Sequence, residues 1–304
     1  MNTFRISSSE SFDKKKYPIL ITIVFFLITA YISFFHHGFW TIFDQDGLFY
    51  LSAGRQIIAG VGENVSLLNA GPAGPVLFAL LESVLKDGLF SIKIISLLSG
   101  TGIVFFSYMV FKNIFSTKIA LVGQLFIAFN PWLGILSTSP LNDLLPIFMS
   151  ILSFYFITKK DIKLTDVIFS ASILGIAFMF RAQPIIFLFA IIVFLIILEK
   201  KPRFKISAVT LLIVFFVLCC SPMLLYNYTV HDKMIDSNSN YYVAVHSKYY
   251  TQEWKDFLLD NMDKDSNAIF SNPDLFLKNY FYNMFYGQPS NLFGFENKVS
   301  ASLI

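Results

Sequence analysis

The chain has 304 residues and a formal net charge of +3; only 14% of its residues are charged, whereas 55% are hydrophobic. Soluble domains carry about 25% charged residues, so this composition excludes an ordinary soluble globular protein, and no basic stripe of the kind that binds nucleic acid is present. Residues 18–35 and 184–198 contain no charge at all, and roughly 20 apolar residues match the thickness of a bilayer's hydrocarbon core. We therefore predict an all-α, multi-span membrane protein.

Seven apolar stretches are predicted to span the membrane. They cover residues 18–36, 89–111, 118–136, 140–158, 164–181, 184–199 and 206–225. A further apolar stretch at 72–86 is shorter, begins among glycines and prolines, and carries Glu82 and Lys86. We interpret it as an interfacial or re-entrant helix.

Basic clusters predict the orientation of these spans. Lysines gather at 14–16, 159–163 and 200–205, and cytoplasmic loops are enriched in Lys and Arg. With all three clusters inside, residues 1–17 form a cytoplasmic tail and 18–225 the seven-span module. Residues 37–88 then form a large first outer loop, and 226–304 an extracytoplasmic C-terminal segment. The predicted location is a cell (plasma) membrane, with the functional site facing outward.

This orientation places several charged residues at the same outer face. Asp44 and Asp46 follow the first span, Asp143 lies at the outer start of the fourth, and Arg181 lies at the outer tip of a helical hairpin. Residues 47–59 carry apolar side chains at Leu48, Leu51, Ile57 and Ile58 with Arg55 and Gln56 between them, which suits an amphipathic helix lying on the membrane. The predicted topology therefore gathers these charged residues at one face of the membrane.

Several short motifs occur in order along this outer face. They are Asp44-Gln45-Asp46, Tyr50-Leu51, Gly60, Gly71-Pro72-Ala73-Gly74-Pro75, Asn130-Pro131, Asn142-Asp143, Phe180-Arg181, Pro184, Pro222 and Tyr226-Asn227-Tyr228. In this order they resemble the C-type (GT-C superfamily) membrane glycosyltransferases, in the branch of dolichyl-phosphate-mannose protein mannosyltransferases and lipid-A aminoarabinose transferases. The resemblance covers roughly residues 15–245. Many members have Asp-Glu where this chain has Asp44-Gln45-Asp46.

The resemblance implies a glycosyltransferase with a polyprenyl-phosphate-linked sugar as donor. The acceptor would be an extracytoplasmic protein, lipid or polysaccharide, and membrane lipids would surround the module. A transporter or flippase is an alternative, although transporters often contain internal repeats, which this sequence lacks. Members usually have further spans after the module, so an inactive or truncated relative that only binds lipid is a second alternative.

The chemistry of sugar transfer assigns roles to these residues. A carboxylate must take the acceptor's proton, and we predict Asp44 for this role, with Asp46 as the second choice; the alternative is that both only solvate a loop. The leaving phosphate needs cations, and we predict Arg181 as a bidentate clamp, with help from Lys86 and Lys93. The alternatives are snorkelling for Arg181 and interfacial anchoring for the two lysines.

Asp143 is predicted to be a supporting acid near the same phosphate. Its alternative role is a charge at a helix N-terminus, where the macrodipole favours an acidic side chain. A group of carboxylates also suits a divalent metal with oxygen ligands. The pattern does not decide between a metal-dependent and a metal-independent site, so the metal and any other cofactor stay unassigned.

Overall fold

The computed structural model describes residues 16–36, 45–61, 71–198 and 202–231, together with five isolated positions of the C-terminal segment. The chain divides into two compact units, Met1–Tyr226 and Asn227–Ile304. Nearly all described residues belong to the first unit, so most of the predicted segment 226–304 lies outside them. The helices of the first unit carry every feature that follows.

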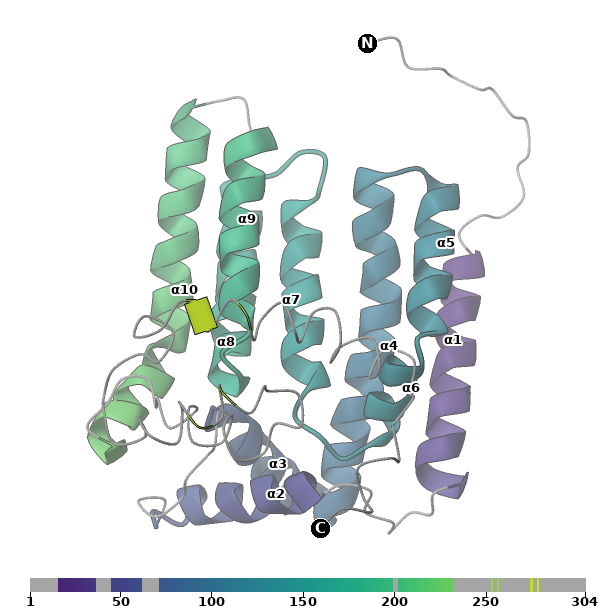
Figure 1. The fold of residues 1–304 in the computed structure, drawn as a ribbon, viewed down its shortest axis with the longest axis vertical. Coiled ribbons are helices and arrows are strands. Elements are labelled where there is room, and N and C mark those ends of the chain that lie inside the picture. The colour runs from purple at the N-terminus through teal and green to yellow at the C-terminus, as the bar shows by residue number, and fades with distance from the viewer. Residues whose placement is uncertain are drawn as a thin grey trace. The chain divides into compact units, whose positions relative to one another are not determined.

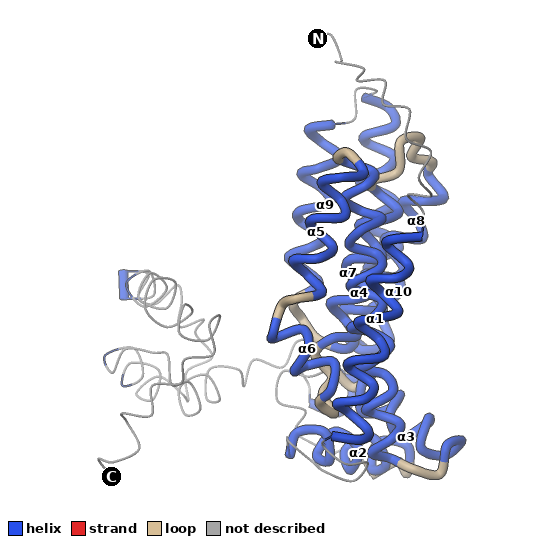
Figure 2. Tube along the Cα trace, turned by 90° about the vertical axis from the view of Figure 1, so that its right-hand side faces the viewer, coloured by secondary structure: helices blue, strands red, loops and turns tan. Residues whose placement is uncertain are grey.

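Every regular element within the described ranges is a helix, which confirms the all-α prediction. In chain order they are α1 (Lys16–Tyr31), the π-helix η1 (Ile32–His36), α2 (Gln45–Ile58), α3 (Ala73–Leu85), α4 (Gly88–Ile114), α5 (Thr117–Ala128), α6 (Pro131–Thr138), α7 (Leu144–Ile157), α8 (Leu164–Phe180), α9 (Pro184–Leu198) and α10 (Pro202–His231). The long helices stand side by side, and α2 and α3 lie across one end of them (Figures 1 and 2).

Three described helices are long and apolar enough to cross a membrane: Lys16–His36, Gly88–Ile114 and Pro202–Val230. The pair α5 and α6 is a fourth candidate if it counts as one bent span. Helices α7, α8 and α9 coincide with predicted spans but are shorter. The seven-span count and the outer loop 37–88 therefore stay predictions, while the two segments predicted as short helices within that range are helical, as α2 and α3.

The stretch predicted as a single span at 118–136 is broken. Helices α5 and α6 meet at an angle of 57°. The Asn130 side chain accepts hydrogen bonds from the backbone N–H groups of Trp132 and Leu133, and Pro131 occupies the first helical position. Asn as N-cap followed by Pro at this position begins a new helix, so the chain turns where one straight helix was expected.

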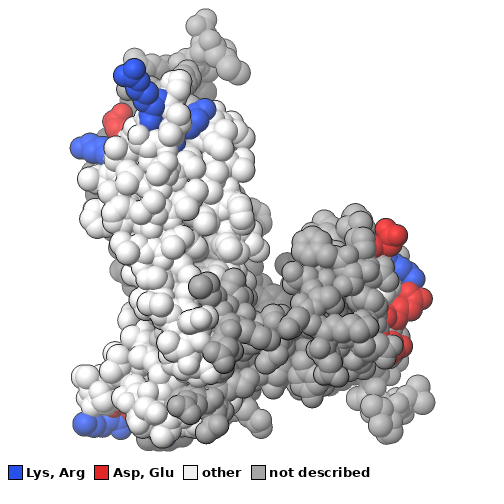
Figure 3. Space-filling view, turned by 90° about the vertical axis from the view of Figure 1, so that its left-hand side faces the viewer, with Lys and Arg blue, Asp and Glu red and all other residues white. Residues whose placement is uncertain are grey.

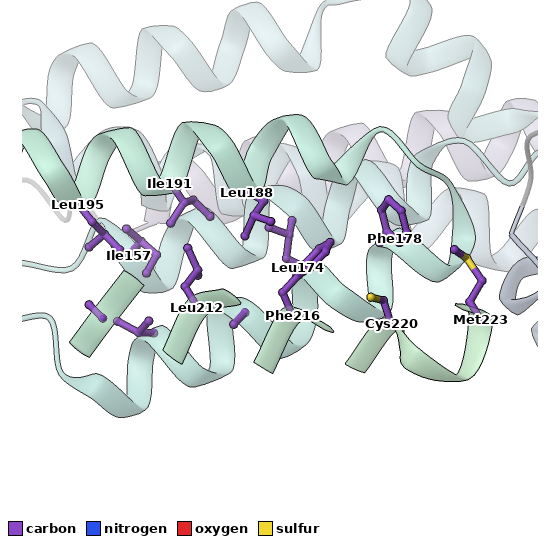
Figure 4. Packing of buried hydrophobic residues seen from close by; sticks show 13 residues of the cluster. Ile157, Leu174, Phe178, Leu188, Ile191, Leu195, Leu212, Phe216, Cys220 and Met223 are labelled. Atoms are coloured by element: carbon purple, nitrogen blue, oxygen red, sulfur yellow. The ribbon is translucent and has the colours of Figure 1, made fainter. Parts of the chain in front are cut away.

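The largest core lies among α7, α8, α9 and α10. Side chains such as Leu174, Ile191, Leu212 and Phe216 point toward one another there (Figure 4). Outward-facing side chains are equally apolar: Ile197 of α9, for example, is 71% exposed. Lys and Arg gather near the ends of the bundle, and the surface between those ends is free of charge in the view of Figure 3. Apolar side chains on the inside and outside alike are typical of a bundle surrounded by lipid.

Polar side chains inside the bundle bond across helices. The hydroxyl groups of Ser153 on α7 and Ser170 on α8 lie 2.7 Å apart, and Gln124 of α5 donates to the carbonyl of Pro18 in α1 at 3.0 Å. In lipid such bonds replace the water that would otherwise hydrate these groups. They fix the rotation of each helix against its neighbour.

Candidate functional site

The site is built on the loop that connects α6 to α7, residues 139–143. Gly47 at the start of α2 touches this loop so closely that a Cβ atom there would collide with the carbonyl oxygen of Pro140. Only glycine fits such an approach. Asp46, which precedes Gly47 in the first turn of α2, is exposed beside this contact. Asp44, the first choice for the general base, lies outside the described residues.

The same loop joins two further motifs through Asn142. The Asn142 side chain is fully buried, and its amide nitrogen donates to the carbonyl oxygen of Phe180 at 3.3 Å. The backbone N–H of Gly71 donates to that same oxygen at 3.0 Å, and Gly74 packs directly against the Asn142 amide. Three segments that are far apart in the sequence therefore meet at Phe180, the residue before Arg181.

Arg181 and Asp143 form an ion pair at this junction. Asp143 lies immediately before α7 and makes no side-chain capping hydrogen bond there, so its carboxylate is directed to the guanidinium group and not to the helix end. Both side chains are partly exposed, Arg181 at 21% and Asp143 at 30%. The structure thus brings together two of the predicted site residues that lie 38 positions apart.

A cavity of about 310 Å³ opens beside this pair. Its polar lining consists of Asp143, Ser150, Arg181 and Gln183, and its remaining wall includes Pro146 and Phe187. The Nε atom of Arg181 is buried and has no hydrogen-bond partner in the described part of the chain. A guanidinium group that retains an unused donor and borders a cavity can bind a phosphate.

The two lysines predicted to assist Arg181 have different environments. Lys93, in the first turns of α4, is only 1% exposed, and its ammonium group donates to the carbonyl oxygen of Ser33 at 3.2 Å. Ser33 lies in η1 and its hydroxyl donates to Thr138, so Lys93 helps to join α4, η1 and α6. Lys86 is exposed at the end of α3, with a positive φ of 60°.

Sequence reasoning missed the ion pair between Arg55 of α2 and Glu82 of α3. Arg55 Nε donates to Glu82 Oε2 at 2.7 Å, and a second bond joins Nη2 to Oε1. The hydrogen bonds from Arg55 lower the pKa of the Glu82 carboxyl below its usual value. The sequence shows opposite charges on these two helices, but it does not show that the two helices lie next to each other.

The described residues contain no group of three His, Cys, Asp or Glu side chains arranged to hold a metal ion. Asp44 lies outside those residues, so the metal stays unassigned. Asn142 was recognised as part of a motif but without a role. Its position next to Asp143 was the only signal in the sequence for its buried contact with Phe180.

Comparison with known proteins gives one match. The family model described as dolichyl-phosphate-mannose-protein mannosyltransferase matches residues 69–226, which include Gly71, Asn142, Asp143 and Arg181 but not Asp44 or Asp46. No curated protein and no solved structure matches the chain. Because the family model covers slightly more than half of the 304 residues, the chain belongs to the dolichyl-phosphate-mannose-protein mannosyltransferase family, a family of membrane glycosyltransferases.

Proposed function

We propose that this protein transfers a sugar from a polyprenyl-phosphate donor to an extracytoplasmic acceptor, which is a protein, a lipid or a polysaccharide. The observation that carries the proposal is the Arg181–Asp143 pair, which borders a cavity at the junction of the family's motifs. The cavity offers a fixed cation and a carboxylate at one end of an apolar bundle. A lipid whose charged phosphate carries a sugar has the matching chemistry.

Arg181 is the residue proposed to bind the donor phosphate. Arg181 directly follows Phe180, whose carbonyl oxygen accepts hydrogen bonds from Asn142 and Gly71. These bonds fix the backbone from which the Arg181 side chain extends. Asp143 holds the guanidinium in position before the substrate arrives. A preorganised cation stabilises the charge that develops on the leaving phosphate.

The transfer itself requires a base. The acceptor hydroxyl loses its proton to a carboxylate, and its oxygen forms a bond to the anomeric carbon of the sugar. The bond between that carbon and the phosphate oxygen breaks, and the polyprenyl phosphate leaves with the electron pair. We assign the base to Asp44, with Asp46 as the alternative.

The position of α2 supports this assignment. Gly47 contacts Pro140, and Asp143 follows Pro140 by three residues. With about 3.8 Å between consecutive Cα atoms, the backbones of Asp46 and Asp143 are at most about 20 Å apart. The base and the phosphate-binding pair can therefore belong to one site. Lys86 and Lys93 remain proposed contributors of positive charge, and a divalent metal remains compatible with the acidic residues.

Donor discharge tests the proposal. Purified protein in nanodiscs is incubated with a panel of radiolabelled polyprenyl-phosphate sugars, and release of polyprenyl phosphate is measured for the wild type, Arg181→Gln, Asp143→Asn, Asp44→Asn and Asp46→Asn. Arg203→Gln is the matched control, because it removes an exposed arginine at the start of α10. Removing a fixed charge that stabilises a leaving group costs roughly 100-fold in turnover, so Arg181→Gln should be about that much slower and Arg203→Gln unchanged.

The aspartate variants distinguish the two choices of base. Only the substitution of the true base should abolish turnover while leaving donor binding intact. If Arg181→Gln released polyprenyl phosphate at the wild-type rate, Arg181 would not be the residue that binds the donor phosphate. If the wild type discharges no donor, with or without added divalent metal and cell-extract acceptors, the lipid-binding and transport alternatives replace the transferase.

A further inference from the structure

A second cavity lies at the opposite end of α7 from the Asp143–Arg181 pair. It has a volume of about 320 Å³ and is bordered by the ends of α4 and α7, by the loop between α7 and α8, and by α9. Since α7 runs from Leu144 to Ile157 and a helix rises 1.5 Å per residue, its two ends are about 20 Å apart, and the two cavities share no lining residue. The second cavity is therefore a separate site.

The walls of this cavity differ in chemistry. Ile157, Ile162, Phe194 and Leu195 provide an apolar wall, and Asn113, Thr158, Lys159 and Lys160 provide a polar one. The Asn113 side chain donates to the Thr158 hydroxyl at 3.3 Å, which joins the end of α4 to the end of α7. Among the described residues that line the cavity, two carry an ammonium group and none carries a carboxylate.

The two lysines differ in how far their charge is already engaged by other side chains. Lys159 binds Asp166 at 2.6 Å and lies over the ring of Phe156, so its charge is largely compensated. Lys160 is exposed, and none of the contacts found among the described residues involves it. An exposed ammonium group beside a cavity attracts a phosphate.

The end of a helix normally presents carbonyl oxygens, which repel anions. At the end of α7 two of these oxygens are occupied: the Thr158 N–H donates to Phe154 and the Thr158 hydroxyl donates to Tyr155. These two bonds reduce the negative potential at the helix end. The two lysines of the lining add positive charge beside it.

We propose that this cavity binds the phosphate headgroup of an anionic phospholipid, with Lys160 as its main contact and Asn113 and Lys159 as additional donors. Basic pockets between spanning helices are suited to such headgroups. The acyl chains would lie along α9, where Val193, Ile196 and Ile197 expose apolar side chains near the cavity lining. Nothing in this site depends on the transferase proposal, because it uses none of the same residues.

Native mass spectrometry of the full-length protein tests the site. The detergent-solubilised protein is titrated with phosphatidylglycerol, with zwitterionic phosphatidylcholine and with soluble glycerol 3-phosphate, and retained adducts are counted for the wild type, Lys160→Gln and Asn113→Ala. Lys118→Gln is the matched control, since Lys118 is an exposed lysine in the first turn of α5 that does not line the cavity. The wild type should retain phosphatidylglycerol in preference to phosphatidylcholine.

One lysine near an anionic lipid surface contributes about fivefold in affinity. Lys160→Gln should therefore weaken phosphatidylglycerol binding about fivefold, and Lys118→Gln should leave it unchanged. Equal weakening by both variants would overturn the site in favour of diffuse attraction. Retention of phosphatidylcholine as strongly as phosphatidylglycerol would overturn the anionic headgroup, and binding of glycerol 3-phosphate as tight as that of the lipid would make the ligand a free phosphate.

Discussion

Asn142 connects the parts of the proposed active site more directly than any of the charged residues. Its buried amide binds the Phe180 carbonyl, and Gly74 leaves the space that this amide occupies. Phe180 ends α8 and precedes Arg181. The direction of the arginine therefore depends on an uncharged side chain from a different segment.

Replacing Asn142 with Ala tests this dependence. In the variant the Phe180 carbonyl keeps only the Gly71 N–H as a donor, and the loss of one hydrogen bond costs about 0.5–1.5 kcal/mol. We expect a lower melting temperature in detergent and, in the discharge assay, a larger rise in KM for the donor than loss of kcat. Lys118→Gln should change neither. An unchanged melting temperature and KM in Asn142→Ala would show that the hydrogen bond does not hold Arg181.

Helices α2 and α3 are joined by a charged pair at their exposed side. Arg55 keeps the pKa of Glu82 below its usual value, so the folded state binds this proton less readily than the unfolded state. The pair therefore stabilises the fold above the unfolded pKa of Glu82. That contribution is lost as the pH falls through the lowered, folded pKa.

The pH dependence of unfolding checks this pair through Glu82→Gln. At neutral pH the wild type should be more stable than the variant by less than about 1 kcal/mol, because Arg55 is exposed and water screens the attraction. The difference should vanish in acid, where Glu82 is protonated. Melting curves that stay equally separated at neutral and acidic pH would contradict the role of the ion pair.

The boundary between α5 and α6 shows which local signals are reliable. Asn130 and Pro131 were recognised as a motif, yet residues 118–136 were predicted as one span because hydropathy alone decided its length. The N-cap and the proline act locally and outweigh that average. By contrast, the short helix predicted at 72–86 was confirmed as α3, because its flanking glycines and prolines and its charges at Glu82 and Lys86 limited its length.

The orientation of the whole bundle can be tested with single cysteines. In a background with Cys219 and Cys220 replaced by Ser, Lys86→Cys and Lys118→Cys place thiols at exposed positions after α3 and in the first turn of α5. With lysine-rich loops inside, a membrane-impermeant maleimide should label Lys86→Cys on intact cells. Lys118→Cys should react only after permeabilisation. Labelling of both on intact cells would reject the predicted topology.

The sequence by itself determined the all-helical class, the membrane environment and the family. These follow from average hydropathy, from the spacing of charges and from the order of short motifs, all of which are properties of neighbouring residues. It also indicated Asp143 and Arg181 as site residues, although it could not show that they form a pair.

Only the tertiary structure decided which residues meet. The convergence of Gly71, Asn142 and Phe180, the burial of Lys93 against Ser33, and the cavity beside Lys160 all join segments that are distant in the chain. Most outward and most inward positions of these helices are apolar, so the period of hydrophobic residues does not reveal which face meets which neighbour. Close approach at glycine and hydrogen bonds between buried polar groups select that arrangement, and they exist only once the helices have packed.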